Sequence, residues 1–437
     1  MKFSSSILAA CYAGLCMARL GRLIPRDLSK DQDPVDPMYQ LSVDEDFHFE
    51  IIRMLGIAPY EGADIAEVLM AIKDLKEKDM STFSDSFYKL ATHVDERAKA
   101  IDSCKHPVSA RNAFFRAATY YRAADFYLHG NSSDPRIDAY WKLHRSAFDK
   151  ALNLMDIPGK RTNLTSTDSN ITIPAIFYSS GKPGPRPTII LCNGYDGSQE
   201  ELYHFLGKSA LERGYNVITY EGPGQPTVRR DQGLGFIPDW EKIGVPVIDY
   251  AASLTQVDKS AMVVMGVSLG GYLATRIAAF DNRPVAVVAI DGIYDYHDVL
   301  TCSMNPKLLE ILNKGDKSTF NNLVMKNKDN LDTTARWGLD QGLWSFKSES
   351  PFDYYTMAKS YTLTGLTDKI KAPVFIGDPE QDIFFQGQPK MLAKPLGANG
   401  TLFSYNTADA AHLHCSEGAT VYLSQTVYDW LDKIVSQ

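Results

Sequence analysis

Hydrophobic and polar positions divide the chain into two regions with different periods. In segment 44–156 apolar residues recur every three to four positions, for example at Phe47, Ile51 and Met54, which is the spacing of amphipathic helices. From residue 161 onward, short runs rich in β-branched residues alternate with longer helical patterns. The chain is therefore predicted to begin with a helical region and to continue as alternating strands and helices.

The apolar runs of the second region predict a sheet. After Thr188, the run 188–192 is continuously apolar, as a strand buried on both faces of a parallel sheet requires. Alternating strands and helices are typical of a doubly wound, mostly parallel sheet of the α/β class. Pro174 lacks a backbone donor, which favours an edge position for its strand. We expect strands at 171–177, 188–192, 216–220, 261–265, 285–290, 374–376 and 402–405, and helices at 199–213, 269–280 and 419–434.

These patterns suggest three parts: a leader with a linker (1–38), a helical cap region (40–156) and a catalytic domain (160–437). A helical insertion at 299–366 interrupts the strands of the catalytic domain and contains Trp337 and Trp344. These aromatic side chains could line a substrate cavity, but core packing is the commoner role for such residues.

The leader resembles a secretory signal. Its apolar run 7–18 ends in small residues, Cys16 and Ala18, at signal-peptidase spacing, and it is too short to span a bilayer. Three arginines between 19 and 26 would also suit an organelle-targeting segment. We predict loss of about 18 residues and entry into the secretory pathway rather than a cytoplasmic location. Glycosylation sequons compatible with this route begin at Asn131, Asn163, Asn170 and Asn399.

Composition excludes several function classes. The chain has 45 Lys and Arg against 53 Asp and Glu, a net charge of −8, and no basic stretch that could follow a phosphate backbone. The six cysteines form no CxxC pair and no zinc-ligand spacing. The sequence has neither a P-loop nor an HExxH motif. We therefore expect no nucleic-acid partner, no metal and no cofactor.

A nucleophile elbow is the strongest chemical signal. Ser268 lies in Gly266-Val267-Ser268-Leu269-Gly270, between a predicted strand and a predicted helix. This turn exposes the serine hydroxyl, and it needs small residues two positions before and two after the serine. Ser268 is therefore the candidate nucleophile.

A serine needs a base, and the base needs an acid to orient it. In this fold the acid follows the serine in sequence and leaves the end of a later strand, and the histidine follows the last strand. Asp382 and Asp378 both meet the first condition, with Asp378 better suited to a turn because Pro379 follows it. His412 and His414 both meet the second condition, and spacing alone does not separate them.

The tetrahedral intermediate requires two backbone donors, one from the residue after the nucleophile and one from the loop after an earlier strand. The first is the amide of Leu269. We assign the second to the amide of Tyr195, where the preceding Gly194 allows a close approach of the chain.

Several motifs resemble one hydrolase family over about residues 47–431. They are Asn193-Gly194-Tyr195-Asp196-Gly197, Glu221-Gly222-Pro223-Gly224-Gln225, Asp382-Ile383-Phe384-Phe385-Gln386-Gly387-Gln388-Pro389 and His414-Cys415. The chain resembles the fungal polyketide-associated α/β-hydrolases that include the heptaketide-shortening hydrolase of the melanin pathway. It is more distantly similar to the FrsA-like esterases and to 2,6-dihydroxypseudooxynicotine hydrolase.

The resemblance has implications for the site. It implies that Asp382 is the acid and His414 the base, and that the helical region packs over the carboxyl edge of the sheet and helps to form the cavity. The chain departs from the family pattern at Pro226, where glycine is usual.

We thus expect a serine hydrolase that cleaves a C–C, ester or thioester bond of a polyketide-type or related secondary metabolite, with or without cyclisation. The expected partner is this small-molecule acyl substrate. The protein is expected to have no stable membrane span, and it could form a homodimer. Two alternatives are a general secreted esterase or peptidase, and a hydrolase-like protein that steers cyclisation without using Ser268.

Overall fold

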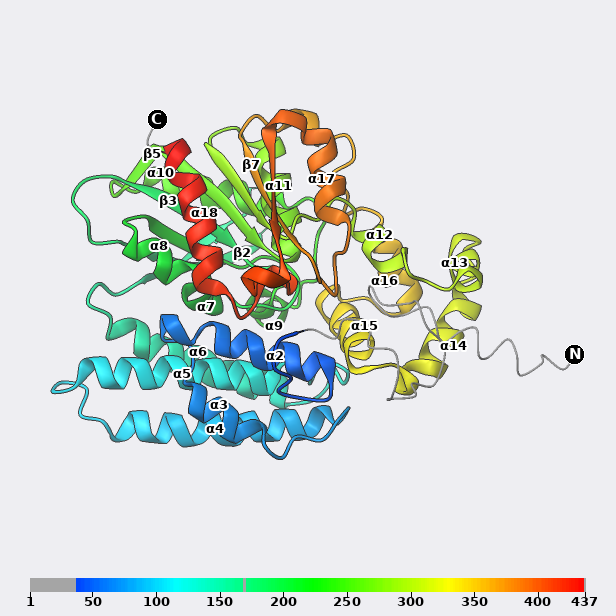
Figure 1. Cartoon of the computed structure of the whole chain (residues 1–437), viewed down its shortest axis with the longest axis horizontal. Coiled ribbons are helices and arrows are strands. Elements are labelled where there is room, and N and C mark those ends of the chain that lie inside the picture. Colours follow the sequence, from blue (N-terminus) through cyan, green and yellow to red (C-terminus); the bar gives the residue numbers. More distant parts are fainter. Residues whose placement is uncertain (1–36, 168–169, 436–437) are drawn as a thin grey trace, which may run out of the picture.

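The computed structural model describes residues 37–167 and 170–435. Almost all of the predicted leader therefore lies outside the described residues. Within them, one layer of helices lies against one end of a twisted sheet, and a second group of helices projects beside it (Figure 1).

The first helices form the layer below the sheet in Figure 1. Asp44 begins this region as an N-cap whose side chain accepts hydrogen bonds from the amides of Asp46 and Phe47. An aromatic cluster holds the layer together, with the Phe83 ring centroid 5.0 Å from that of Phe47 and 4.6 Å from that of Phe87. The helices are α2 (Glu45–Gly56), α3 (Ile65–Ile72), α4 (Met80–Ala100), α5 (Pro107–Asp125) and α6 (Arg136–Asn153).

The sheet has eight strands in the order β1-β2-β4-β3-β5-β6-β7-β8. β1 and β2 are antiparallel to their neighbours, and all later pairs are parallel, so the predicted fold class is confirmed. The strands are β1 (Lys160–Thr165), β2 (Thr172–Tyr178), β3 (Arg186–Cys192), β4 (Asn216–Tyr220), β5 (Val257–Val267), β6 (Ala286–Ile290), β7 (Val374–Pro379) and β8 (Gly400–Tyr405).

The edge position predicted for the strand of Pro174 is wrong. Strand β1 pairs outside it, with Asn163 opposite Pro174. The sequence analysis missed β1 because five of its six residues are polar or charged and it is only partly buried, so it shows no apolar run. Pro174 instead lies at a position where the sheet needs no backbone N–H donor. Its carbonyl oxygen accepts a hydrogen bond from the amide of Glu221.

Helices cover both faces of the sheet. On one face α18 packs with α8, and on the other α10 packs with α11. The predicted helix at 199–213 contains a π-helical turn at Tyr203–Gly207. The helices are α7 (Gln199–Leu202), α8 (Lys208–Glu212), α9 (Pro226–Asp231), α10 (Glu241–Ser253), α11 (Leu269–Phe280), α17 (Gln388–Leu396) and α18 (Thr420–Val435).

The second group of helices, which projects beside the sheet in Figure 1, lies between β6 and β7 in the chain. Its member α15 packs against α2, so the two helical parts of the chain meet near the carboxyl ends of the parallel strands. Ligands bind at this end of open α/β sheets. The helices are α12 (Tyr296–Thr301), α13 (Pro306–Asn313), α14 (Lys317–Asn327), α15 (Thr333–Ser345) and α16 (Pro351–Ala358).

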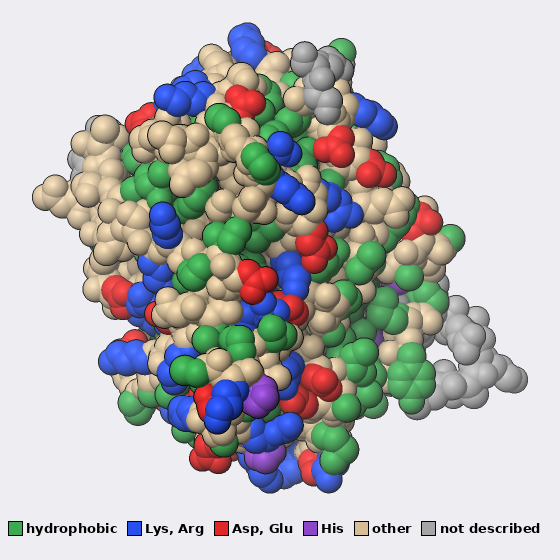
Figure 2. Space-filling view, turned by 90° about the vertical axis from the view of Figure 1, so that its left-hand side faces the viewer, with side chains coloured by type: hydrophobic (Ala, Val, Ile, Leu, Met, Phe, Trp, Pro, Cys, Tyr) green, Lys and Arg blue, Asp and Glu red, His purple; other side chains and the backbone are tan. Residues whose placement is uncertain are grey.

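The outer surface carries both signs of charge. On the face shown in Figure 2, basic and acidic side chains are interspersed, as the near balance of 45 and 53 charged residues predicts. Among the described residues, none of the helices combines the length and the apolar character that crossing a bilayer demands.

Candidate active site

Ser268 lies on a strained turn between β5 and α11. Its backbone has φ +59° and ψ −128°, a conformation that costs free energy for a residue with a side chain. A Cβ on Gly266 would collide with the carbonyl group of Gly270. The elbow therefore requires glycine at that position, as its sequence pattern indicates.

His414 contacts Ser268 and Asp382 at the same time. Its Nε2 lies 3.0 Å from Ser268 Oγ, and its Nδ1 lies 3.0 and 3.1 Å from the carboxylate oxygens of Asp382. Asp382 is fixed in turn by the amides of Phe384 and Phe385, which donate over 2.7 and 3.0 Å. The structure thus brings these three predicted residues into one hydrogen-bonded row.

A second carboxylate, which the sequence analysis missed, also reaches His414. Asp291 Oδ2 lies 2.7 Å from His414 Nδ1 and accepts a 2.6 Å hydrogen bond from the amide of Cys415. Asp291 follows β6 directly, has φ +60° and is fully buried. It satisfies the strand-end rule that identified Asp382, so applying that rule to the strand before the insertion would have found it.

The pKa values of these groups depend on one another. Burial and the nearby Asp382 raise the pKa of Asp291 to about 6. Burial would raise the pKa of Asp382 as well, but His414 and the amides of Phe384 and Phe385 hold it below its usual value. Burial would lower the pKa of His414, but Asp382, Cys415 and Asp291 hold it well above the usual histidine value. Two carboxylates therefore stabilise the imidazolium form of one histidine.

The alternative candidates lie elsewhere. His412 is buried two residues away, and its carbonyl accepts from the amide of Gln381. Asp378 is the fifth residue of β7 and lies 3.4 Å from the ammonium group of Lys390. Of these two residues, neither lines the cavity onto which Ser268 opens.

The loop after β3 abuts the elbow. A Cβ on Gly194 would lie 2.9 Å from the Leu269 amide nitrogen and 3.0 Å from Ser268 Cβ, so only glycine allows this approach. Leu269 begins α11, where the first amides have no intrahelical acceptor. Gln225 supports the loop through its amide group, which donates to the carbonyl of Asn193 over 2.5 Å. The two expected oxyanion donors, Leu269 and Tyr195, thus belong to backbone segments in contact.

Pro226, the departure from the family pattern, fits this support. It is the first residue of α9, where proline needs no donor and its fixed φ suits the helix. The preceding Gln225 therefore keeps its position beside the loop.

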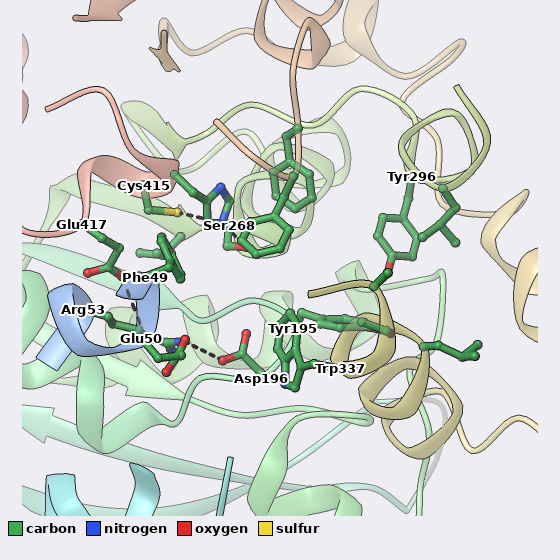
Figure 3. Close-up of a pocket in the computed structure, with 18 of the residues that line it drawn as sticks. Phe49, Glu50, Arg53, Tyr195, Asp196, Ser268, Tyr296, Trp337, Cys415 and Glu417 are labelled. Atoms are coloured by element: carbon green, nitrogen blue, oxygen red, sulfur yellow. Dashed lines mark hydrogen bonds and ion pairs between the residues drawn. The ribbon is translucent and has the colours of Figure 1, made fainter. Parts of the chain in front are cut away.

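Ser268 and His414 open onto a cavity with about 950 Å³ of space free of protein atoms, part of it open to solvent. Figure 3 shows Ser268 above the cavity, with Tyr296 on one side and Glu417 on the other. Helix α2 contributes Phe49, Glu50 and Arg53, as the resemblance implied. Eight aromatic side chains line the cavity: Phe49, Tyr195, Tyr296, Trp337, Tyr354, Tyr355, Phe384 and Phe385.

The two tryptophans of the insertion have different roles. Trp337 lines the cavity. Trp344 stacks on His129 at 4.0 Å and lies under the guanidinium group of Arg230 at 4.7 Å. The cavity interpretation therefore applies to Trp337 and the core interpretation to Trp344.

One side of the cavity is charged. Arg53 binds both oxygens of Glu201 at 2.8 Å and Asp196 at 2.7 Å, and Arg122 from α5 also binds Asp196 at 2.7 Å. Burial would raise the pKa of Asp196, but the two arginines lower it below its usual value. Burial raises the pKa of Glu417, whose Oε2 has no hydrogen-bond partner among the described residues. This side of the cavity therefore offers polar groups to a substrate.

Asp291, His414 and Cys415 offer ligand atoms that lie within 4.8 Å of one another. A metal would need a thiolate from Cys415, but burial raises the pKa of that thiol well above its usual value. Both ring nitrogens of His414 are also already in hydrogen bonds. The donor set therefore suits proton transfer better than metal binding.

Known hydrolases resemble this chain in sequence and in fold. The family model described as "Esterase FrsA-like" matches residues 88–312. Hydrolase LUC6 from Fusarium sp is 30% identical and the match covers 91% of this chain and 98% of the relative. 20-hydroxy-prefusarin hydrolase FUS2 from Gibberella moniliformis is 30% identical, with 90% and 98% covered. The solved structure of 2,6-dihydroxy-pseudo-oxynicotine hydrolase superposes with a TM-score of 0.69 at 20% identity, over 87% of this chain and 95% of that chain.

Proposed function

Because the chain belongs to the FrsA-like esterase family of α/β-hydrolases, we propose that it is a serine-dependent hydrolase of polyketide-type secondary metabolites. That it is a hydrolase of the α/β type follows from the family. The proposal adds the nucleophile, the residues that assist it and the class of substrate.

In the proposed reaction, Ser268 Oγ attacks an acyl carbonyl carbon and its proton passes to His414 Nε2, 3.0 Å away. Asp382 accepts the hydrogen bond from Nδ1 and keeps the ring in the tautomer that can take this proton. The amides of Leu269 and Tyr195 stabilise the oxyanion. His414 then protonates the leaving group, and water releases the acyl group from Ser268 by the same steps in reverse.

Two observations support the substrate class. The aromatic wall of the cavity suits a flat, conjugated acyl compound, because ring faces pack well against one another. The relative FUS2 is named for hydrolysis of 20-hydroxy-prefusarin. The bond cleaved in this chain would be a C–C, ester or thioester bond next to a carbonyl, since each yields the same acyl-enzyme.

The row Ser268–His414–Asp382, beginning on a strained elbow, is the observation that carries the proposal. We expect Ser268→Ala to retain about 10⁻³ to 10⁻⁶ of the turnover, with an unchanged melting temperature. A fluorophosphonate probe should label Ser268 in the wild-type protein but should not label the Ser268→Ala variant.

The same experiment tests the alternatives. If the Ser268→Ala protein converted a polyketide substrate at the wild-type rate, the hydrolytic role would be refuted and a steering role would replace it. If simple nitrophenyl acetates were turned over far faster than aromatic acyl esters, a general esterase would be favoured instead.

A further inference from the structure

Three tyrosine hydroxyls form a hydrogen-bonded chain beside the cavity. Tyr296 Oη lies 2.7 Å from Tyr354 Oη, which lies 3.0 Å from Tyr195 Oη. Tyr195 Oη in turn donates to the carbonyl oxygen of Gly338 over 2.6 Å. The three residues come from α12, α16 and the loop after β3, and all three line the cavity.

The carbonyl at the end fixes the direction of every hydrogen bond in this chain. A carbonyl oxygen can only accept, so the proton of Tyr195 is committed to Gly338. Tyr354 must then donate to Tyr195, and Tyr296 must donate to Tyr354. The oxygen of Tyr296 is left with lone pairs and with no proton to give.

This arrangement requires all three hydroxyls to stay protonated and in place. Burial raises the pKa of Tyr354 to about 12 and those of Tyr195 and Tyr296 well above the usual value, so the groups are neutral at physiological pH. The Tyr296 ring is stacked on Phe346 at 5.7 Å with the planes 6° apart. A Cβ on Gly342 would lie 2.5 Å from Tyr195 Oη and Tyr354 Cζ, so the absence of a side chain there makes room for the chain.

We propose that the Tyr296 oxygen is a subsite for a hydrogen-bond donor of the substrate, a phenol or enol hydroxyl, while Ser268 attacks the acyl carbonyl. Figure 3 places Tyr296 across the cavity from Glu417, with Ser268 between them. A hydroxyl on the substrate would complete the chain, whereas an ether or ketone oxygen would place lone pairs against lone pairs. The inference rests on the proposed function, because it concerns a substrate bound for attack by Ser268.

The test uses sets of esters that differ only in the group that meets Tyr296. Each set consists of 4-nitrophenyl esters of a phenylalkanoic acid with a 4-hydroxy, a 4-methoxy or no ring substituent. Several alkyl lengths vary the distance between the carbonyl and the ring. For the length that fits, we expect kcat/KM of the hydroxy ester to exceed that of the methoxy ester by about 10-fold, the value of one hydrogen bond.

Two variants test the direction of the chain. In Tyr296→Phe the acceptor is lost, and the ratio of hydroxy to methoxy kcat/KM should fall to about one. In Tyr354→Phe the proton of Tyr296 is released and can be given to the substrate. The methoxy ester should then gain relative to the unsubstituted ester, and the ratio of hydroxy to methoxy kcat/KM should fall towards one, because the oxygen of either ester can accept that proton. A general loss of packing would lower kcat/KM of all three esters alike and would leave the ratios between them unchanged.

Tyr361→Phe is the matched control. Its ring centroid lies 6.3 Å from that of Tyr296, but its buried hydroxyl has no hydrogen-bond partner among the described residues. Its removal should leave the ratio at the wild-type value. The inference is overturned if no alkyl length shows a hydroxy preference or if Tyr296→Phe keeps it. Failure of the proposed function gives a different result, namely that Ser268→Ala still hydrolyses all the esters.

Discussion

Replacement of Asp382 by asparagine should cost this protein less activity than the same change costs a serine hydrolase with a single acid. The neutral amide introduced by this change could no longer hold the proton on His414 Nδ1 as a carboxylate does. However, Asp291 Oδ2 lies 2.7 Å from the same nitrogen, closer than the 3.0 and 3.1 Å of Asp382. A second carboxylate is thus already in place to accept the hydrogen bond.

The expected loss follows from the strength of that bond. Removal of the acid from a serine triad lowers kcat by about 10⁴-fold, which corresponds to about 5.4 kcal/mol of transition-state stabilisation. A hydrogen bond to a charged group is worth about 1.5–3 kcal/mol. If Asp291 supplies this bond in place of Asp382, about 2.7 kcal/mol of the roughly 5.4 kcal/mol is retained. The remaining loss of about 2.7 kcal/mol corresponds to about 10²-fold in kcat.

Steady-state kinetics on one aromatic ester can test this expectation with three variants and a control. We expect about 10²-fold loss for Asp382→Asn, less than about 10-fold for Asp291→Asn and about 10⁴-fold for the double variant. Asp378→Asn should change nothing, because Asp378 does not line the cavity. A loss of about 10⁴-fold in Asp382→Asn with no further loss in the double variant would refute a role for Asp291.

Three further predictions follow from the structure. The acid limb of the kcat/KM profile should lie above the usual pKa range of histidine, because only neutral His414 can accept a proton and its pKa is raised. Asp291→Asn should move this limb to lower pH. An unmoved limb would contradict the reasoning. Burial lowers the pKa of His204 from 6.5 to about 4, so the folded state binds fewer protons than the unfolded state between these pH values. The free energy of unfolding should therefore fall by about 3 kcal/mol as the pH drops from 6.5 to 4. Urea unfolding at several pH values should show that this free energy depends less on pH in His204→Phe. Gly194→Ala should lower kcat by about 10²-fold or more through displacement of the oxyanion loop, while circular dichroism shows a folded protein.

Local patterns were sufficient for the fold class, the family resemblance and the elbow. The fold class and the resemblance are confirmed by the comparisons. The elbow could be found because its glycines and its serine are neighbours in sequence. The helix after Ser268 has the expected bounds, and the strand before it extends beyond the expected bounds at both ends. Strand β1 was missed since a polar edge strand has no apolar period.

Contacts between distant residues could not be predicted in the same way. His412 and His414 are two residues apart in one loop, and a bend with φ +54° at Cys415 belongs to the turn that carries His414. The approach of Asp291 to His414 depends on two strand ends separated by the whole helical insertion. The tyrosine chain likewise joins three elements, so neither its members nor its direction appear in any sequence motif.

The salt bridges of Arg53 and Arg122 determine how this chain could be divided. Both arginines lie on helices that precede the sheet, yet they neutralise Asp196 and Glu201 beside the oxyanion loop. A catalytic fragment that began after Asn153 would retain these carboxylates without their guanidinium partners, and each would lose the groups that compensate its burial. The helical region is therefore not an exchangeable module, and gene fusions or chimaeras that transplant the hydrolase segment alone should give an inactive protein.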